Sequence, residues 1–123
     1  MKKKDNIKWL TQPYQEDYPA AQSYLSLTFE ESEATSLVEK LKLVTLVQYK
    51  AKDIFRASSL SLLGISNRLV KKDLKKIKND DKISPLLLVR NSANGKVIIA
   101  DGYHRLCAVY SLDEDALIPC KIV

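Results

Sequence analysis

The residues best suited to chemistry lie where a predicted strand ends, in the motif Asp101-Gly-Tyr-His-Arg105. His104, the only histidine of the chain, directly precedes Arg105 at the start of a helical pattern. The first turn of a helix attracts anions, because its backbone N–H groups are free and the helix dipole is positive there. The motif therefore predicts a phosphate site in which the N–H groups of Tyr103 and His104 donate hydrogen bonds. Gly102 would let the ligand approach the backbone, and Arg105 would add a two-pronged charged donor.

Two side chains of this motif have competing interpretations. Asp101 is either the N-cap of the helix, with its carboxylate on the same N–H groups, or an acid or base in a reaction. His104 is a candidate for acid–base catalysis or phosphate binding, and the alternative is an ordinary surface or core histidine. The sequence leaves both choices open.

Positive charge is concentrated in the same part of the chain. The formal net charge of +5 divides into −1 for residues 1–43 and +6 for residues 44–123. This division favours a phosphate-bearing partner, either a nucleotide or a nucleic acid, although a solvated basic surface is the commoner cause of such an excess. The same two interpretations apply to the lysine-rich stretch 71–78. No aromatic residues are interleaved with those lysines, so the stretch carries no sequence signal for base stacking.

The elements that must position the motif form an α+β domain with a small mixed sheet. Periodicity and β-propensity predict strands at 43–49, 86–90, 96–100 and 118–123. A helical hairpin is expected over 19–43, with Thr28 capping its second helix. Further helices are expected at 54–57 with Asp53 as its cap, from Ser66 or Asn67 to about 78, and at 101–112. Asn94-Gly95 predicts a hairpin turn between the second and third strands.

Length and composition exclude several classes of protein. The 123 residues suit one domain with a modest core. No apolar run approaches the roughly 18 residues that cross a membrane, and the basic start lacks an apolar signal core, so a cytoplasmic protein is expected. Cys107 and Cys120 have neither CxxC spacing nor a histidine cluster. They are expected to be reduced, half-buried thiols, and no metal site is expected.

From Val47 onward, several short motifs follow one another in a familiar order. They are Val47-Gln-Tyr49, Asp53-Ile54, a helix ending in Leu74-Lys-Lys-Ile77, Ile83-Ser-Pro-Leu-Leu-Leu-Val-Arg90, Gly95, Ile98-Ile-Ala-Asp-Gly-Tyr-His-Arg-Leu-Cys-Ala108 and Ile118-Pro-Cys-Lys-Ile-Val123. In this order they resemble the ParB/sulfiredoxin-like superfamily, and the match covers about two-thirds of the chain. The whole chain also resembles short, stand-alone bacterial proteins. In this interpretation residues 44–123 form the superfamily core, and residues 1–43 are a helical extension.

The resemblance implies a nucleotide whose phosphates bind at the Gly-x-His-Arg turn. Gly102, His104 and Arg105 match that turn, and Lys71 and Lys75 lie on the helix that flanks the nucleotide in relatives. Tyr103 stands where sulfiredoxin has its reactive cysteine, so sulfinic-acid reduction is not expected. No helix-turn-helix follows this fold in the sequence, so operator reading of the ParB type is not expected either.

The expected function is therefore that of a small bacterial protein that binds a nucleotide or another phosphorylated small molecule. ATP or another nucleotide with Mg²⁺ is the expected cofactor, and phosphotransfer or phosphohydrolysis is the expected reaction if the protein is an enzyme. The alternative is a non-enzymatic module that binds nucleic acid, or binds a protein through the hairpin 19–43. The sequence leaves the substrate and the oligomeric state open.

Overall fold

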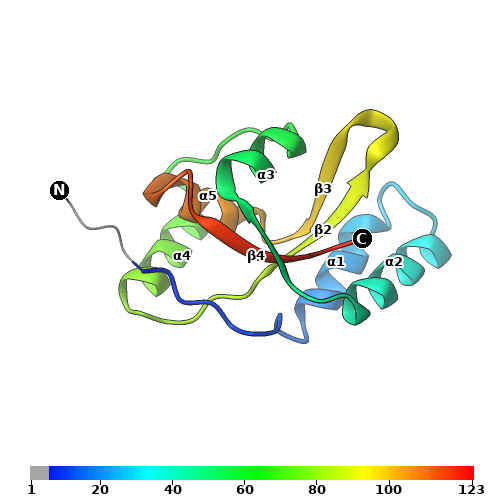
Figure 1. Cartoon of the computed structure of the whole chain (residues 1–123), viewed down its shortest axis with the longest axis horizontal. Coiled ribbons are helices and arrows are strands. Elements are labelled where there is room, and N and C mark those ends of the chain that lie inside the picture. Colours follow the sequence, from blue (N-terminus) through cyan, green and yellow to red (C-terminus); the bar gives the residue numbers. More distant parts are fainter. Residues whose placement is uncertain (1–5) are drawn as a thin grey trace.

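A four-stranded mixed sheet forms the centre of the protein (Figure 1), in a computed structural model that describes residues 6–123. The strand order is β1-β4-β2-β3. β2 and β4 pair in parallel, and the other neighbouring strands pair antiparallel. The strands are β1 (Val47–Lys50), β2 (Leu86–Asn91), β3 (Lys96–Asp101) and β4 (Leu117–Ile122). This arrangement confirms the predicted α+β fold with a small mixed sheet.

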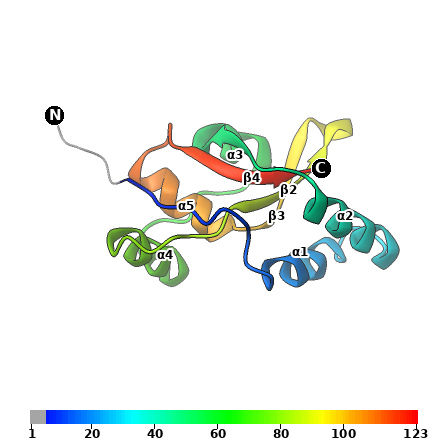
Figure 2. The ribbon, with the colours of Figure 1, turned by 60° about the horizontal axis from the view of Figure 1, so that its bottom comes forward.

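Within residues 6–123, five α-helices cover the two faces of this sheet (Figure 2). Two of them, α1 and α2, pack on one face, whereas α3 and α5 pack on the other and α4 lies outside α5. The helices are α1 (Asp17–Leu25), α2 (Glu31–Leu43), α3 (Ala51–Ser58), α4 (Arg68–Lys78) and α5 (Tyr103–Leu112). None of these helices is long and apolar enough to span a membrane.

β2 is buried on both faces, and its side chains alternate between two hydrophobic cores. Leu86 and Leu88 join the core formed with α3, α4 and α5. Leu87 and Val89 join the core formed with α1 and α2. Strands covered on both sides are continuously apolar, which explains the run Leu86–Val89. The segment 1–43, predicted as an extension, thus contributes helices that cover one face of the sheet.

Several predicted boundaries need correction. Thr28 does not cap α2, because the helix begins after Glu30 and no side chain caps it. The helix continues through Leu43, so β1 begins only at Val47. Asp53 lies in the first turn of α3, whose N-cap position is Lys50, so it is not the cap either.

The structure selects Asn67 from the two predicted starts of α4, Ser66 and Asn67, and it confirms the predicted hairpin turn. The Asn67 side chain caps α4 by accepting hydrogen bonds from the N–H groups of Leu69 at 2.9 Å and Val70 at 3.1 Å. A 3₁₀ turn over Ser92–Asn94 connects β2 to β3, and Gly95 follows it with a φ of 64°. That left-handed conformation favours glycine.

Candidate functional site

The predicted motif lies at the junction between β3 and α5, as expected from the sequence. β3 ends at Asp101, Gly102 has a φ of 108°, and α5 begins at Tyr103. A Cβ atom at Gly102 would lie 2.8 Å from Leu86 Cγ and 2.9 Å from Arg105 Nη2. The glycine therefore makes room for side chains of the protein itself. That Gly102 also lets a ligand approach the backbone stays a prediction.

Asp101 is not the cap of α5. No side chain among the described residues caps this helix, and the carboxylate of Asp101 instead accepts a hydrogen bond from Arg105 Nη2 at 3.0 Å. The pKa of Asp101 is raised because burial disfavours the charged carboxylate, although the nearby Arg105 acts in the opposite direction. The capping interpretation is thus wrong, and the N-terminus of α5 is left without a side-chain partner.

Arg105 is held by acceptors from three segments of the protein. Its Nη2 donates to the carbonyl oxygen of Pro85 at 3.2 Å and to Asp101, and it lies 3.6 Å from Asp17 Oδ2. The Arg105 side chain is 16% exposed, and its Nε atom is buried with no hydrogen-bond partner in the part of the chain that the structure describes. The guanidinium thus joins α1, β3 and the start of β2. Its charge is largely compensated by two carboxylates.

A buried hydrogen-bond network extends from Asp17 to the loop before α1. Ser84 Oγ donates to Asp17 Oδ2 at 2.5 Å and accepts a hydrogen bond from the backbone N–H of Tyr14 at 3.2 Å. Asp17 and Ser84 were not identified from the sequence. These two residues lie 67 positions apart in the chain, so no local sequence pattern could signal the contact between them.

A pocket of about 340 Å³ lies in front of the α5 N-terminus. It contains all five residues of the predicted motif together with side chains of α1, α4 and the loop before α1. The lining residues are Tyr14, Glu16, Asp17, Leu69, Lys72, Asp73, Lys76, Asp101, Gly102, Tyr103, His104 and Arg105. Charged side chains of both signs therefore meet here.

The lysines that line this pocket differ from the predicted pair, Lys71 and Lys75. Lys72 and Lys76 line the pocket, whereas Lys71 and Lys75 are exposed and absent from its wall. Their position depends on the rotation of α4, which spacing along one helix cannot determine. Asp73 lies in the same wall, and its pKa is raised because burial outweighs the attraction of Arg105 and Lys76.

A second pocket, of about 450 Å³, adjoins the first at the same turn. The two share Asp101, Gly102, Tyr103 and His104. The walls of the second are mainly apolar and aromatic and include Ala20, Tyr24, Leu60 and Ile99. The hydroxyl of Tyr103 donates to the carbonyl oxygen of Ser61 and so ties the loop after α3 to α5. His104 consequently stands at the boundary between a charged pocket and an apolar one.

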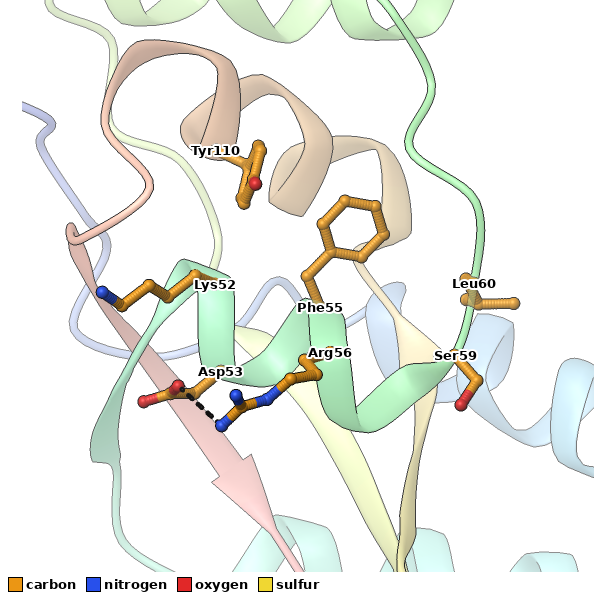
Figure 3. Close-up of a pocket in the computed structure, with 7 residues that line it drawn as sticks. All are labelled: Lys52, Asp53, Phe55, Arg56, Ser59, Leu60 and Tyr110. Carbon is orange, nitrogen blue, oxygen red and sulfur yellow. Dashed lines mark ion pairs between the residues drawn. The ribbon is translucent and has the colours of Figure 1, made fainter.

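A larger depression of about 530 Å³ on α3 contains none of the predicted site residues (Figure 3). Phe55 of α3 and Tyr110 of α5 meet edge to face in it, with ring centroids 5.1 Å apart. Its two cations already have partners. Lys52 lies 2.7 Å from Asp115, and Arg56 lies 3.7 Å from Asp53. We therefore place the candidate site at the α5 N-terminus.

The side chains near the candidate site do not fit a metal ion held by the protein. Among residues 6–123, no group of three His, Cys, Asp or Glu side chains is arranged as metal ligands. The carboxylates of Asp17 and Asp101 are engaged by Ser84 and Arg105. The described residues of this site therefore offer no set of protein ligands for the predicted Mg²⁺.

Both cysteines are fully buried, which corrects the prediction of half-buried thiols. Cys107 lies on the inward face of α5 and Cys120 lies in β4, with both side chains in the same core. Burial raises the pKa of Cys107 and raises that of Cys120 to about 12. Both thiols are therefore protonated near neutral pH and poorly nucleophilic.

Comparison of the chain with protein-family models, curated proteins and solved structures finds no match. The interpretation of the site therefore depends on its geometry and its charges.

Proposed function

We propose that the protein binds a phosphorylated ligand, such as a nucleotide, at the N-terminus of α5. The observation that carries this proposal is a ten-residue helix that opens into a pocket without a side-chain cap. Asp101 would otherwise occupy the first N–H groups, but Arg105 holds it elsewhere. A phosphate group could accept those hydrogen bonds, and the helix dipole favours its negative charge.

Cations beside the helix end support the same ligand class. Lys72 and Lys76 line the pocket from α4. His104 lines it from α5 and offers ring nitrogens as hydrogen-bonding groups. Asp73 opposes them, since its carboxylate would repel a phosphate. Because the pKa of Asp73 is raised, its charge is lost at a higher pH than that of an ordinary aspartate. Phosphate binding should accordingly strengthen as Asp73 becomes protonated.

The adjoining pocket offers room for the rest of a nucleotide. Tyr24, Leu60 and Tyr103 form an apolar and aromatic wall next to the proposed phosphate position. A base or sugar could contact this wall while the phosphates remain at the α5 N-terminus. The superfamily resemblance, which includes Gly102, His104 and Arg105, agrees with a nucleotide but is itself a prediction.

Phosphotransfer or phosphohydrolysis is a further step of the proposal. Among the described residues, three titratable side chains line both pockets, namely those of Asp101, Tyr103 and His104. Asp101 is engaged by Arg105 and the Tyr103 hydroxyl by the carbonyl of Ser61, so His104 is the candidate to exchange a proton with a bound phosphorylated ligand. Asp101 is proposed to hold Arg105 in place rather than to exchange a proton, because its carboxylate accepts a hydrogen bond from Arg105. No step through a metal ion held by the protein is included.

The proposal is tested by thermal-shift and calorimetric titrations with pyrophosphate, ATP, CTP and GTP, each with and without Mg²⁺. Wild-type protein should bind at least one of them. The variant Lys72→Ala/Lys76→Ala should bind it about tenfold more weakly, because two of the pocket's cations are lost. Lys71→Ala/Lys75→Ala changes the same helix by the same charge outside the pocket, so it should bind like wild type.

Two results would contradict the proposal. One is the absence of binding by any of these compounds, and the other is an equal loss in the two lysine double variants. His104→Ala separates binding from turnover. It should lower the rate of any phosphate release by a larger factor than it lowers the affinity for the ligand. Arg105→Ala is unsuitable as the main test, because it removes the shared partner of Asp17 and Asp101.

A further inference from the structure

The outer surface of α4 carries a continuous row of cations. Six of the eleven residues of this helix are basic. Val70 and Ile77 turn inward and are buried, so the helical period places the basic residues on the opposite half of the helix. Figure 2 shows α4 at the periphery of the molecule, outside α5. The cations are Arg68, Lys71, Lys72, Lys75, Lys76 and Lys78, and all except Lys76 are exposed.

These cations are not compensated by acids on the same surface. Within residues 6–123, none of the six forms an ion pair. The acid of the helix, Asp73, is half-buried toward the pocket, and Asp80 and Asp81 lie beyond the helix end. Like charges four residues apart, such as Lys71 and Lys75, destabilise a helix. A row of this kind complements a partner with closely spaced negative charges.

The tertiary structure also brings an aromatic side chain to this surface. Tyr14, in the loop before α1, lines the charged pocket together with Lys72 and Lys76 and is 41% exposed. The loop is anchored there, because the backbone N–H of Tyr14 donates to Ser84. Cations that follow a backbone and an aromatic ring that stacks on a base are the features of sites for single strands.

An anionic membrane fits this surface less well. A helix that lies in a membrane interface presents apolar side chains beside its cations. In α4, Val70 and Ile77 are instead buried and Leu74 packs against the same core. Leu69, 40% exposed, borders the charged pocket, so a single apolar side chain rather than an apolar stripe accompanies the cations. The partner favoured by these observations is therefore a nucleic acid.

We propose that the outer face of α4 binds single-stranded nucleic acid, with phosphates along its cations and a base against Tyr14. This surface goes beyond the proposed phosphate pocket, because Arg68, Lys71, Lys75 and Lys78 lie outside that pocket. A small phosphorylated ligand and a single strand would share only the cations at the pocket edge, Lys72 and Lys76.

The test is fluorescence anisotropy with a labelled single-stranded oligonucleotide of mixed sequence, between about 50 and 200 mM salt. Binding should weaken with salt, with a log–log slope of about −3 if four or five phosphates are contacted. Lys71→Glu/Lys75→Glu should reduce the affinity at least tenfold and make the slope shallower. Lys40→Glu/Lys96→Glu makes the same change in net charge at exposed positions elsewhere, and it should have little effect.

A second variant tests the stacking contact. Tyr14→Leu should weaken binding about tenfold with the salt slope unchanged, since stacking on a base involves no counterion release. The proposal is overturned if both lysine pairs lose equal affinity, if a duplex binds as tightly as the single strand, or if anionic vesicles bind more tightly than the oligonucleotide.

The same variants keep this proposal distinct from the phosphate pocket. Lys71→Glu/Lys75→Glu should leave the thermal shift with ATP or pyrophosphate unchanged. His104→Ala should reduce that shift and leave oligonucleotide binding close to wild type. If the oligonucleotide does not bind while a nucleotide does, the α4 surface is refuted and the pocket is not.

Discussion

Arg105 is the residue on which the geometry of the candidate site depends. Its Nη2 contacts Asp17 of α1, the carbonyl of Pro85 before β2, and Asp101 of β3. These contacts draw Asp101 away from the α5 N-terminus and leave the first turn open. The sequence motif predicts Arg105 as a ligand for phosphate, and that prediction is untested. In the structure its guanidinium holds the carboxylates of Asp17 and Asp101, and both Arg105 and His104 line the charged pocket.

Replacing Gly102 tests how tightly this turn is packed. Gly102→Ala should lower the free energy of unfolding by about 2–4 kcal/mol, because it adds both a strained φ and an overlap with Leu86 and Arg105. Gly95→Ala is the matched control, since Gly95 also has a positive φ but has no atom within 4 Å of an added Cβ. It should cost only about 1–2 kcal/mol. Urea unfolding measures both, and equal losses would refute the close packing at Gly102.

The raised pKa of Asp101 predicts a pH dependence of stability. Its folded carboxyl binds a proton more tightly than the unfolded one, whose pKa is about 3.9. The resulting stabilisation is complete below that pH and is lost as the pH rises through the folded pKa. Wild type should therefore lose stability relative to Asp101→Asn as the pH rises from about 4. Thermal unfolding of both proteins across pH checks this, and the opposite trend would mean that the attraction of Arg105 outweighs burial.

At the scale of elements, α4 determines which cations face the candidate site. Val70 and Ile77 pack into the core beside α5, and this contact sets the rotation of the helix. Lys72 and Lys76 consequently face the pocket, and Lys71 and Lys75 face outward. The lysine spacing in the sequence predicts one basic surface. The spacing does not determine which edge of that surface borders the pocket at the α5 N-terminus.

The cap of α4 offers a test at this scale. Asn67→Ala should lower the free energy of unfolding by about 1 kcal/mol, because the N–H groups of Leu69 and Val70 lose their acceptor. Thr28→Ala is the control, since Thr28 is exposed and does not cap α2. It should change stability by less than about 0.5 kcal/mol. Chemical denaturation of the two variants measures the difference, and a larger loss in Thr28→Ala would contradict the observed capping.

At the scale of the whole molecule, the sheet separates two cores that share β2. Its residues Leu86 and Leu88 point to one core, and Leu87 and Val89 point to the other. The helices of residues 1–43 therefore cover apolar side chains of the sheet. Removal of that cover would expose Leu87 and Val89 to water. The stability of the candidate site at the end of β3 is thus linked to helices distant in sequence.

Two leucines of α2 test this dependence. Leu41 is fully buried against the sheet core, whereas Leu43 is 84% exposed on the same helix. Leu41→Ala should lower the free energy of unfolding by about 2–5 kcal/mol, and Leu43→Ala should change it by less than about 0.5 kcal/mol. Denaturant unfolding followed by circular dichroism measures both. Similar small losses would show that α2 does not form part of the core.

The sequence by itself determined the α+β class, the β3–α5 junction, a start of α4 at Ser66 or Asn67, and the turn at Gly95. These features depend on local periodicity, β-propensity and turn chemistry, which a few adjacent residues encode. Only the tertiary structure decided that Asp101 pairs with Arg105, that Lys72 and Lys76 face the pocket, and that Tyr14 lies beside α4. Each of these contacts joins separate elements, so it depends on how the cores orient the helices rather than on spacing within one segment.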